Sequence, residues 1–172
     1  MDIEELVKKS KEGDKNALVQ LIMLNKRDYY KIAYVFMKNN EDAMDVMEDM
    51  IVILYENIHK LRDEKAFDRW SKTILVNCCK NTLRKKKKII LLENIKEDIY
   101  EEDFQSKEKG IILEEHLSKL NEKHREVIKL RYYLDMDYKT IANIVKVPVG
   151  TVKSRISNGL KKLKESLGGE NL

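Results

Sequence analysis

Residues 120–167, LNEKHREVIKLRYYLDMDYKTIANIVKVPVGTVKSRISNGLKKLKESL, show the pattern of two helices separated by a short break. Asp137 is placed to cap a first short helix, because its carboxylate can accept a hydrogen bond from a backbone N–H of the first turn. The pair Lys146 and Val147 interrupts the pattern, and Pro148 fits the first turn of a second helix, where its missing N–H costs nothing. The stretch therefore predicts a helix-turn-helix.

The second helix of this pair is predicted to run to about residue 167. Spacings of three and four place its apolar residues on one buried stripe, which comprises Val152, Ile156, Leu160, Leu163 and Leu167. Polar and cationic residues occupy its N-terminal end, where a recognition helix offers side chains to base edges, and lysines follow within reach of phosphates. The alternative is an ordinary helical hairpin with a solvated lysine face. Such a hairpin would not explain why the Gly-Thr-Val-Lys-Ser-Arg run is present.

The composition favours an all-α protein with two small domains. The chain has 172 residues, six glycines, one proline and 37% charged residues, and it contains no long alternating β-branched run. The formal net charge is only +4. This modest value hides segregation, because residues 84–88 are basic and residues 93–103 are acidic. Local basic faces matter more than net charge for binding a nucleic acid.

We expect a first helical domain at residues 1–90, a flexible acidic linker at 91–110 and a second helical domain at 111–172. The linker is predicted from the high charge density and poor periodicity of residues 93–110, ENIKEDIYEEDFQSKEKG. The N-terminus carries neither a basic segment nor an apolar one, and the apolar runs are too short to span a membrane. A cytoplasmic protein without membrane insertion is therefore expected.

One helix of the first domain carries an acidic face. It is expected to follow Asn40 as its cap and to present Asp45, Glu48 and Asp49 on one side. A negative patch is unsuited to DNA, so it favours a protein partner, and a simply solvated face is the alternative.

The next helix, starting at about Phe67 after a loop at 59–66, carries a different set of groups. Opening duplex DNA needs aromatic wedges that replace base stacking, polar groups that hold an extruded base and cations that neutralise the backbone. Phe67, Trp70, Asn77 and the run Arg84–Lys88 supply all three. Burial of the two aromatic residues in the core is the simpler alternative.

The sequence does not indicate an enzyme, a metal site or a cofactor site. The three histidines, His59, His116 and His124, are scattered, and the chain has no P-loop, no H-E-x-x-H and no glycine-rich phosphate cradle. The adjacent residues Cys78 and Cys79 cannot form an ordinary disulfide within a helix, so buried thiols are expected.

Together these motifs resemble bacterial RNA polymerase sigma factors, in particular the compact extracytoplasmic-function (ECF) branch of the sigma-70 family. Residues 148–155, PVGTVKSR, resemble region four, and the series from Ala43 to Arg84 resembles region two. The resemblance covers roughly residues 5–88 and 111–167. It implies two helical domains, a region two bundle and a region four helix-turn-helix, in a protein that binds core RNA polymerase and directs promoter recognition and transcription initiation.

The resemblance also implies which residues bind. Region two would contact the minus-ten element through His59, Lys60, Arg62, Lys65, Trp70, Asn77, Arg84, Lys85, Lys86 and Lys87. Region four would contact the minus-thirty-five element through Arg125, Tyr138, Pro148, Gly150, Thr151, Lys153, Ser154 and Arg155. Polymerase would be bound by Asp45, Glu48 and Asp49 at the β′ clamp helices and by region four at the β flap. An anti-sigma factor is a further implied partner, and no catalytic residue, metal or cofactor is implied.

Three departures from the family pattern bear on the fold. Lys146 replaces the turn glycine, where a positive φ would strain it. Gly159 occupies a position where alanine is usual and is expected to weaken the helix by about 1 kcal/mol. Ser71 follows Trp70 where leucine is usual.

Two other functions fit part of the sequence. A dimeric helix-turn-helix regulator that is not a polymerase subunit would explain residues 120–167 and leave the first domain unexplained. A sigma-like decoy would bind polymerase without melting DNA.

Overall fold

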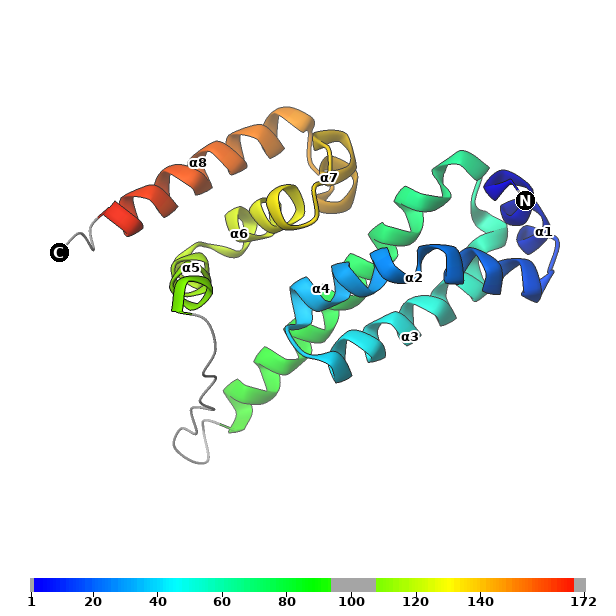
Figure 1. The fold of residues 1–172 in the computed structure, drawn as a ribbon, viewed down its shortest axis with the longest axis horizontal. Coiled ribbons are helices and arrows are strands. Elements are labelled where there is room, and N and C mark those ends of the chain that lie inside the picture. Colours follow the sequence, from blue (N-terminus) through cyan, green and yellow to red (C-terminus); the bar gives the residue numbers. More distant parts are fainter. Residues whose placement is uncertain (1, 94–107, 169–172) are drawn as a thin grey trace. The chain divides into compact units, whose positions relative to one another are not determined.

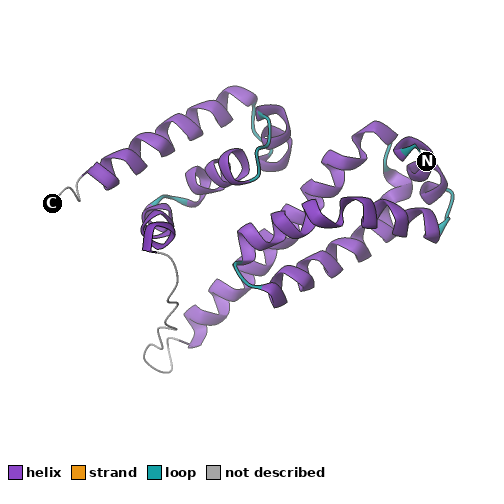
Figure 2. Ribbon diagram, in the orientation of Figure 1, coloured by secondary structure: helices purple, strands orange, loops and turns teal. Residues whose placement is uncertain are grey.

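The computed structural model describes residues 2–93 and 108–168, and the chain divides into two compact units, Met1–Lys96 and Glu97–Leu172. The first unit contains α1 (Ile3–Lys11), α2 (Lys15–Met37), α3 (Asn40–Asn57), the 3₁₀ turns η1 (Ile58–Lys60) and η2 (Glu64–Ala66), and α4 (Phe67–Glu93) (Figure 1). The second unit contains α5 (Glu108–Lys119), α6 (Glu122–Ile128), the π-helical turn η3 (Lys129–Tyr133), α7 (Tyr138–Val145) and α8 (Val149–Gly168). Figure 2 shows helices and short loops throughout these ranges, so the all-α expectation is confirmed.

Helix α4 continues to Glu93 and α5 begins at Glu108, so both ends of the segment predicted as a linker, 91–110, are helical. The remainder of that segment, 94–107, lies outside the described residues.

In the first unit, α2, α3 and α4 pack along one another, and α1 covers the end where α2 begins and α3 finishes (Figure 1). The largest fully buried side chains come from all four helices: Leu6, Leu21, Tyr29, Met50, Leu54, Phe67 and Leu75. Helix α3 is capped by Asn39 rather than by the expected Asn40. Asn39 has an extended backbone, and its Oδ1 accepts the backbone N–H of Asp42 at 2.9 Å.

Ser71 belongs to a buried polar pair in this core. The Tyr29 hydroxyl donates to Ser71 Oγ at 2.8 Å, and Ser71 Oγ donates to the Asp68 carbonyl at 3.0 Å. Burial raises the pKa of Tyr29 to about 12, so its hydroxyl remains a donor at neutral pH. A leucine at position 71 would leave this hydroxyl without its partner at a cost of about 1–3 kcal/mol, which explains why the serine accompanies Tyr29.

The second unit is built around the packing of α6 and α7 on α8. Its core includes Leu117, Leu120, Ile128 and Leu163. The expected cap of α7 is confirmed, since Asp137 accepts the backbone N–H of Thr140 at 2.9 Å, and Asn121 caps α6 by accepting that of His124 at 2.9 Å. Helix α6 ends at Ile128 and passes directly into η3.

The buried face of α8 differs from the predicted stripe. Val152, Ile156 and Leu163 are buried as expected, whereas Leu160 is 37% exposed and Leu167 is 39% exposed. Gly159 is buried in place of Leu160. At 3.6 residues per turn, positions 152, 156, 159 and 163 lie closer to one line than a set that includes 160 and 167. The predicted stripe was therefore wrong at its two exposed leucines.

Gly159 marks a close crossing of α8 over α6. A Cβ atom at this position would lie 2.8 Å from Ile128 Cδ1 and 3.1 Å from His124 Cβ. Both distances are shorter than the separation at which carbon atoms attract, which is about 3.5–4.0 Å. Close packing therefore accounts for this glycine, and the expectation that it only weakens α8 was incomplete.

Lys146 ends α7 in the left-handed conformation, with φ 55° and ψ 48°, and its N–H donates to the Ala142 carbonyl. The turn at Lys146 therefore has the positive φ expected at the position of the family's turn glycine, although the residue here is a lysine.

Replacing Lys146 with glycine is expected to stabilise the second unit by roughly 1 kcal/mol. The left-handed conformation costs a residue with a side chain about 1–2 kcal/mol, and the added freedom of glycine in the unfolded chain offsets part of this gain. Urea unfolding followed by circular dichroism gives the free energy of unfolding. Lys161→Gly is the control, because the same change inside α8 should destabilise by about 1 kcal/mol. Equal destabilisation by both substitutions would show that Lys146 carries no strain.

Candidate nucleic-acid interface

The connection between α3 and α4 presents four predicted DNA-binding residues to solvent: His59, Lys60, Arg62 and Lys65. The backbone of this connection is anchored to the rest of the first unit. Leu61 is buried, and Lys11 Nζ of α1 forms an ion pair with Glu64 Oε1 of η2 at 2.5 Å. The loop thus combines a fixed backbone with cationic side chains that remain accessible to a nucleic acid.

Trp70 lies half-buried in the first turn of α4 and is supported by Phe67. The two ring centroids are 6.3 Å apart with planes inclined at 52°. Phe67 is only 1% exposed, so it belongs to the core and cannot act as the DNA wedge that its sequence position allowed. Asn77 is also half-buried and lies seven residues beyond Trp70, hence on the same side of the helix. One ring and one amide therefore lie on the same side of α4.

The basic run Arg84–Lys87 occupies the later turns of α4 and is exposed throughout. One member is already paired, because Lys86 Nζ contacts Asp42 Oδ2 in the first turn of α3. Hydrogen bonds from Asn39 and from Lys86 lower the pKa of Asp42, which keeps its carboxylate charged. Asp42 therefore competes with any phosphate for Lys86.

Substituting Asp42 with asparagine is expected to strengthen binding to duplex DNA. Freeing one lysine for a phosphate should steepen the slope of log K against log salt by about 0.9. Fluorescence anisotropy with a duplex oligonucleotide over a range of salt concentrations measures this slope. Glu41→Gln is the matched control, since it removes one negative charge from the same exposed turn. An identical slope change in both variants would mean that general charge, and not Lys86, is responsible.

The acidic residues Asp45, Glu48 and Asp49 are exposed on α3 as predicted. Sequence reasoning missed the apolar residues among them. Met44 is 43% exposed and Val52 is 55% exposed. Their spacing of eight residues, with Glu48 halfway between, places all three on one line of the helix. A surface that mixes exposed apolar groups with carboxylates suits a protein partner better than it suits solvent.

The N-terminal turns of α8 present the predicted recognition residues. Pro148, Gly150, Lys153 and Ser154 are exposed, whereas Thr151 and Arg155 are half-buried. The Pro148 carbonyl accepts the N–H of Thr151 at 2.9 Å and that of Val152 at 3.1 Å, which closes the first turn directly after the break. The side chains at this end form a compact polar surface suitable for base edges and phosphates.

Tyr138, the first residue of α7, links this surface to η3. The Arg131 guanidinium lies 4.9 Å from its ring centroid, and Lys153 Nζ lies 5.5 Å from it. Arg131 also donates to the Met136 carbonyl at 2.9 Å. The ring therefore restricts where the Lys153 ammonium can lie, through two cation–π contacts that sequence spacing does not reveal.

Arg125 has a structural contact in addition to its predicted DNA role. Its Nη1 donates to the Ser118 carbonyl at 3.1 Å and so joins α6 to the end of α5. The nearby His124 has its Nδ1 buried without a hydrogen-bond partner. Burial lowers the pKa of His124, with the charges of Lys162 and Arg155 acting in the same direction, so the imidazole is neutral at pH 7.

The histidines, cysteines and carboxylates do not assemble into a metal site within residues 2–93 and 108–168. His116 is buried, and its Nδ1 lies 2.5 Å from Ser166 Oγ. Cys78 and Cys79 are buried free thiols, as predicted. Burial raises the pKa of both, that of Cys79 to about 12. Among the described helices, none has the length and apolarity needed to cross a membrane.

The models of two protein families match this chain. Sigma-70 region 2 matches residues 21–89, and Sigma-70, region 4 matches residues 116–165. The RNA polymerase sigma factor SigV of Bacillus subtilis is 29% identical over 95% of this chain and 99% of its own. The ECF RNA polymerase sigma-E factor of Haemophilus influenzae is 30% identical over 89% of this chain and 88% of its own.

Two solved structures share the fold. CnrH, in complex with the cytosolic domain of CnrY, has a TM-score of 0.71 and 21% identity over 98% of this chain and 99% of its own. The sigma factor RpoE from Bartonella quintana, in complex with the anti-sigma factor NepR, has a TM-score of 0.65 and 21% identity over 88% of this chain and 97% of its own.

Proposed function

Because this chain belongs to the sigma-70 family of RNA polymerase sigma factors, in its ECF branch, we propose that its two units bind two separate promoter elements. We assign residues 1–90 to region two, 91–110 to a linker and 111–172 to region four. Region two opens the minus-ten element and region four binds the minus-thirty-five element. The observation that carries this assignment is the first unit, where an acidic and apolar face on α3 accompanies the aromatic, amide and cationic series of α4.

Core polymerase docks on the acidic face of α3. Asp45, Glu48 and Asp49 supply the charge that steers association with the β′ clamp helices, and the exposed apolar residues Met44 and Val52 supply contact area. Region four contacts the β flap.

Region two captures the minus-ten element at the start of α4. Trp70 stacks against the base pair at the edge of the melted segment, and Asn77 with the loop residues His59, Lys60, Arg62 and Lys65 holds an extruded base. Arg84, Lys85, Lys86 and Lys87 neutralise the backbone upstream.

Region four contacts the minus-thirty-five element from the N-terminal end of α8. Gly150, Thr151, Lys153, Ser154 and Arg155 face the major groove, while Arg125, Tyr138 and Pro148 contact the backbone beside it. Lys153 is positioned for its contact by the Tyr138 ring, 5.5 Å from its Nζ.

The chain has no catalytic role of its own and needs no cofactor, since nucleotide addition belongs to the polymerase. Its place is the cytoplasm, where core polymerase lies. An anti-sigma factor is a further partner, in line with the complexes of CnrH with CnrY and of RpoE with NepR.

Run-off transcription on fragmented genomic DNA tests this function. Core polymerase with this protein should initiate at discrete new sites, and alignment of those sites should show two elements at fixed separation. Tight DNA binding by the protein alone, with no new initiation, would instead favour a dimeric helix-turn-helix regulator. In that case a footprint without polymerase would cover a palindromic operator.

A further inference from the structure

Lys146 occupies the turn of the helix-turn-helix in a backbone conformation that favours glycine. Its φ is 55°, and its N–H donates to the Ala142 carbonyl at the end of α7. The N–H of Val147 donates to the same carbonyl at 3.2 Å, so two hydrogen bonds fix the backbone of the turn. The side chain of Lys146 is exposed. A strained residue that contributes nothing to the core is a candidate for a role in binding.

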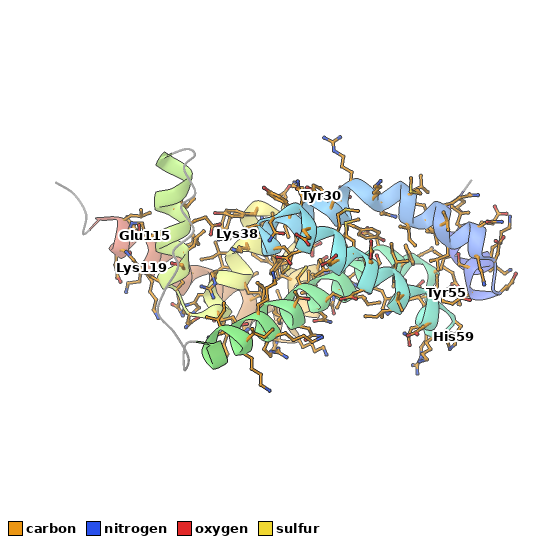
Figure 3. The ribbon with its side chains drawn as sticks, turned by 90° about the horizontal axis from the view of Figure 1, so that it is seen from below. Tyr30, Lys38, Tyr55, His59, Glu115 and Lys119 are labelled. Atoms are coloured by element: carbon orange, nitrogen blue, oxygen red, sulfur yellow. The ribbon has the colours of Figure 1, made fainter. Side chains whose placement is uncertain are left out.

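The Lys146 ammonium has no partner within the part of the chain that the structure describes. No hydrogen bond, ion pair or ring contact joins its Nζ to another group there. The sequence explains this, because residues 138–164 contain seven lysines and arginines and neither aspartate nor glutamate. Where a carboxylate is available, this unit does form an ion pair, since Lys119 Nζ lies 3.1 Å from Glu115 Oε1 on α5 (Figure 3). The charge of Lys146 is therefore available to an anion outside the protein.

The place of the turn in the fold indicates which anion this is. In a helix-turn-helix, the N-terminal end of the second helix enters the major groove while the first helix crosses the DNA backbone. Lys146 ends α7 and lies three residues before Val149, where α8 begins. The turn therefore lies at the edge of the groove, among phosphates. A lysine suits a phosphate there, because its three donors rotate on a flexible stem and need no fixed geometry.

We propose that Lys146 binds a DNA phosphate beside the minus-thirty-five element. The inference rests on the proposed function, because region four must already occupy the major groove. Members of the family that carry the usual turn glycine lack this contact. The contact offsets the cost of holding a lysine in the left-handed conformation. It adds affinity and salt dependence without changing which bases are preferred.

A salt titration of promoter binding tests this contact. Holoenzyme is bound to duplex DNA that carries the minus-thirty-five element of a promoter recovered by run-off transcription. Lys146→Gln should reduce the slope of log K against log salt by about 0.9, so that a fourfold rise in salt weakens its binding about 3-fold less than that of the wild type. Lys146→Arg should keep the wild-type slope. Base substitutions in the element should cost all three proteins the same factor.

Lys146→Gly separates a phosphate contact from a structural role. This variant should lose the same slope as Lys146→Gln, although relief of the strained turn makes its second unit more stable. A purely structural role would instead move stability and DNA affinity in the same direction. Lys26→Gln is the matched control, because it removes one exposed lysine charge from α2 and should leave the slope unchanged.

The outcomes distinguish this contact from the function on which it rests. A wild-type slope in Lys146→Gln overturns the proposed contact and leaves the other contacts of region four intact. An equal loss of slope in Lys26→Gln also overturns it, because general charge is then responsible. Wild-type holoenzyme that binds a scrambled duplex as tightly as the minus-thirty-five duplex overturns the proposed function, and this contact with it.

Discussion

Trp70→Ala is expected to slow promoter opening by about 5- to 150-fold while leaving binding to the minus-thirty-five element unchanged. One base–aromatic stack contributes about 1–3 kcal/mol, and this stack forms only when the duplex separates. Trp70 is half-buried in the first turn of α4, and its ring centroid lies 6.3 Å from that of Phe67. The loss should therefore appear in opening rather than in closed-complex formation.

Permanganate reactivity of unpaired thymines, followed over time with the holoenzyme, measures opening directly. Trp70→Phe is the control, since it retains a stacking ring and should open within a few-fold of the wild type. A thermal unfolding curve for each variant separates lost stacking from lost packing against Phe67. Unchanged opening in a correctly folded Trp70→Ala protein would remove the melting role of this residue. If promoter opening by the Asn77→Ala protein were unchanged as well, a sigma-like decoy that binds polymerase without melting DNA would become the better interpretation.

Gly159→Leu is expected to destabilise the second unit by about 2–3 kcal/mol and so to abolish binding to the minus-thirty-five element. Even a Cβ would lie 2.8 Å from Ile128 Cδ1, and Ile128 is buried in the core of this unit, so it has little space into which to move. Overpacking of this kind costs about 1–3 kcal/mol, and separating α6 from α8 would also displace the recognition residues.

Urea unfolding of the full chain gives the change in free energy, and gel-shift assays of holoenzyme with promoter DNA give the change in binding. Gly168→Leu is the volume-matched control, because a Cβ at Gly168 meets no atom within 4 Å. Its free energy of unfolding should stay within about 0.5 kcal/mol of the wild type. A Gly159→Leu protein that unfolds at the same urea concentration as the control would show that the crossing is not tight.

Local signals allowed most of the fold to be predicted from the sequence. Asp137 acts within four residues of its own position, and the structure confirms it as the cap of α7. Pro148, predicted in the first turn of the second helix, directly precedes α8, which begins at Val149. The acidic set on α3 and the cations on α4 follow from helical period alone, which also predicts that they are exposed.

The features that were missed depend on partners far away in the chain. The sequence alone predicts that Gly159 weakens its own helix, because it does not reveal that α6 crosses there. The bond between Tyr29 and Ser71 joins positions 42 residues apart, and the Asp42–Lys86 pair joins positions 44 apart. The ring of Tyr138 between two cations likewise depends on how η3, α7 and α8 meet. Local spacing carries no information on such contacts.

The two buried thiols have a practical consequence for labelling chemistry. Burial raises the pKa of Cys79 to about 12, so its thiol is almost wholly protonated at pH 7. Maleimides and peroxides react with the thiolate, so Cys79 is nearly inert towards them, and burial protects Cys78 in the same way. A cysteine introduced at an exposed position beside the proposed contacts, such as Arg69 or Ser157, would react selectively with a fluorophore. Dyes can therefore report on the faces proposed to bind the minus-ten and minus-thirty-five elements without prior removal of the native cysteines.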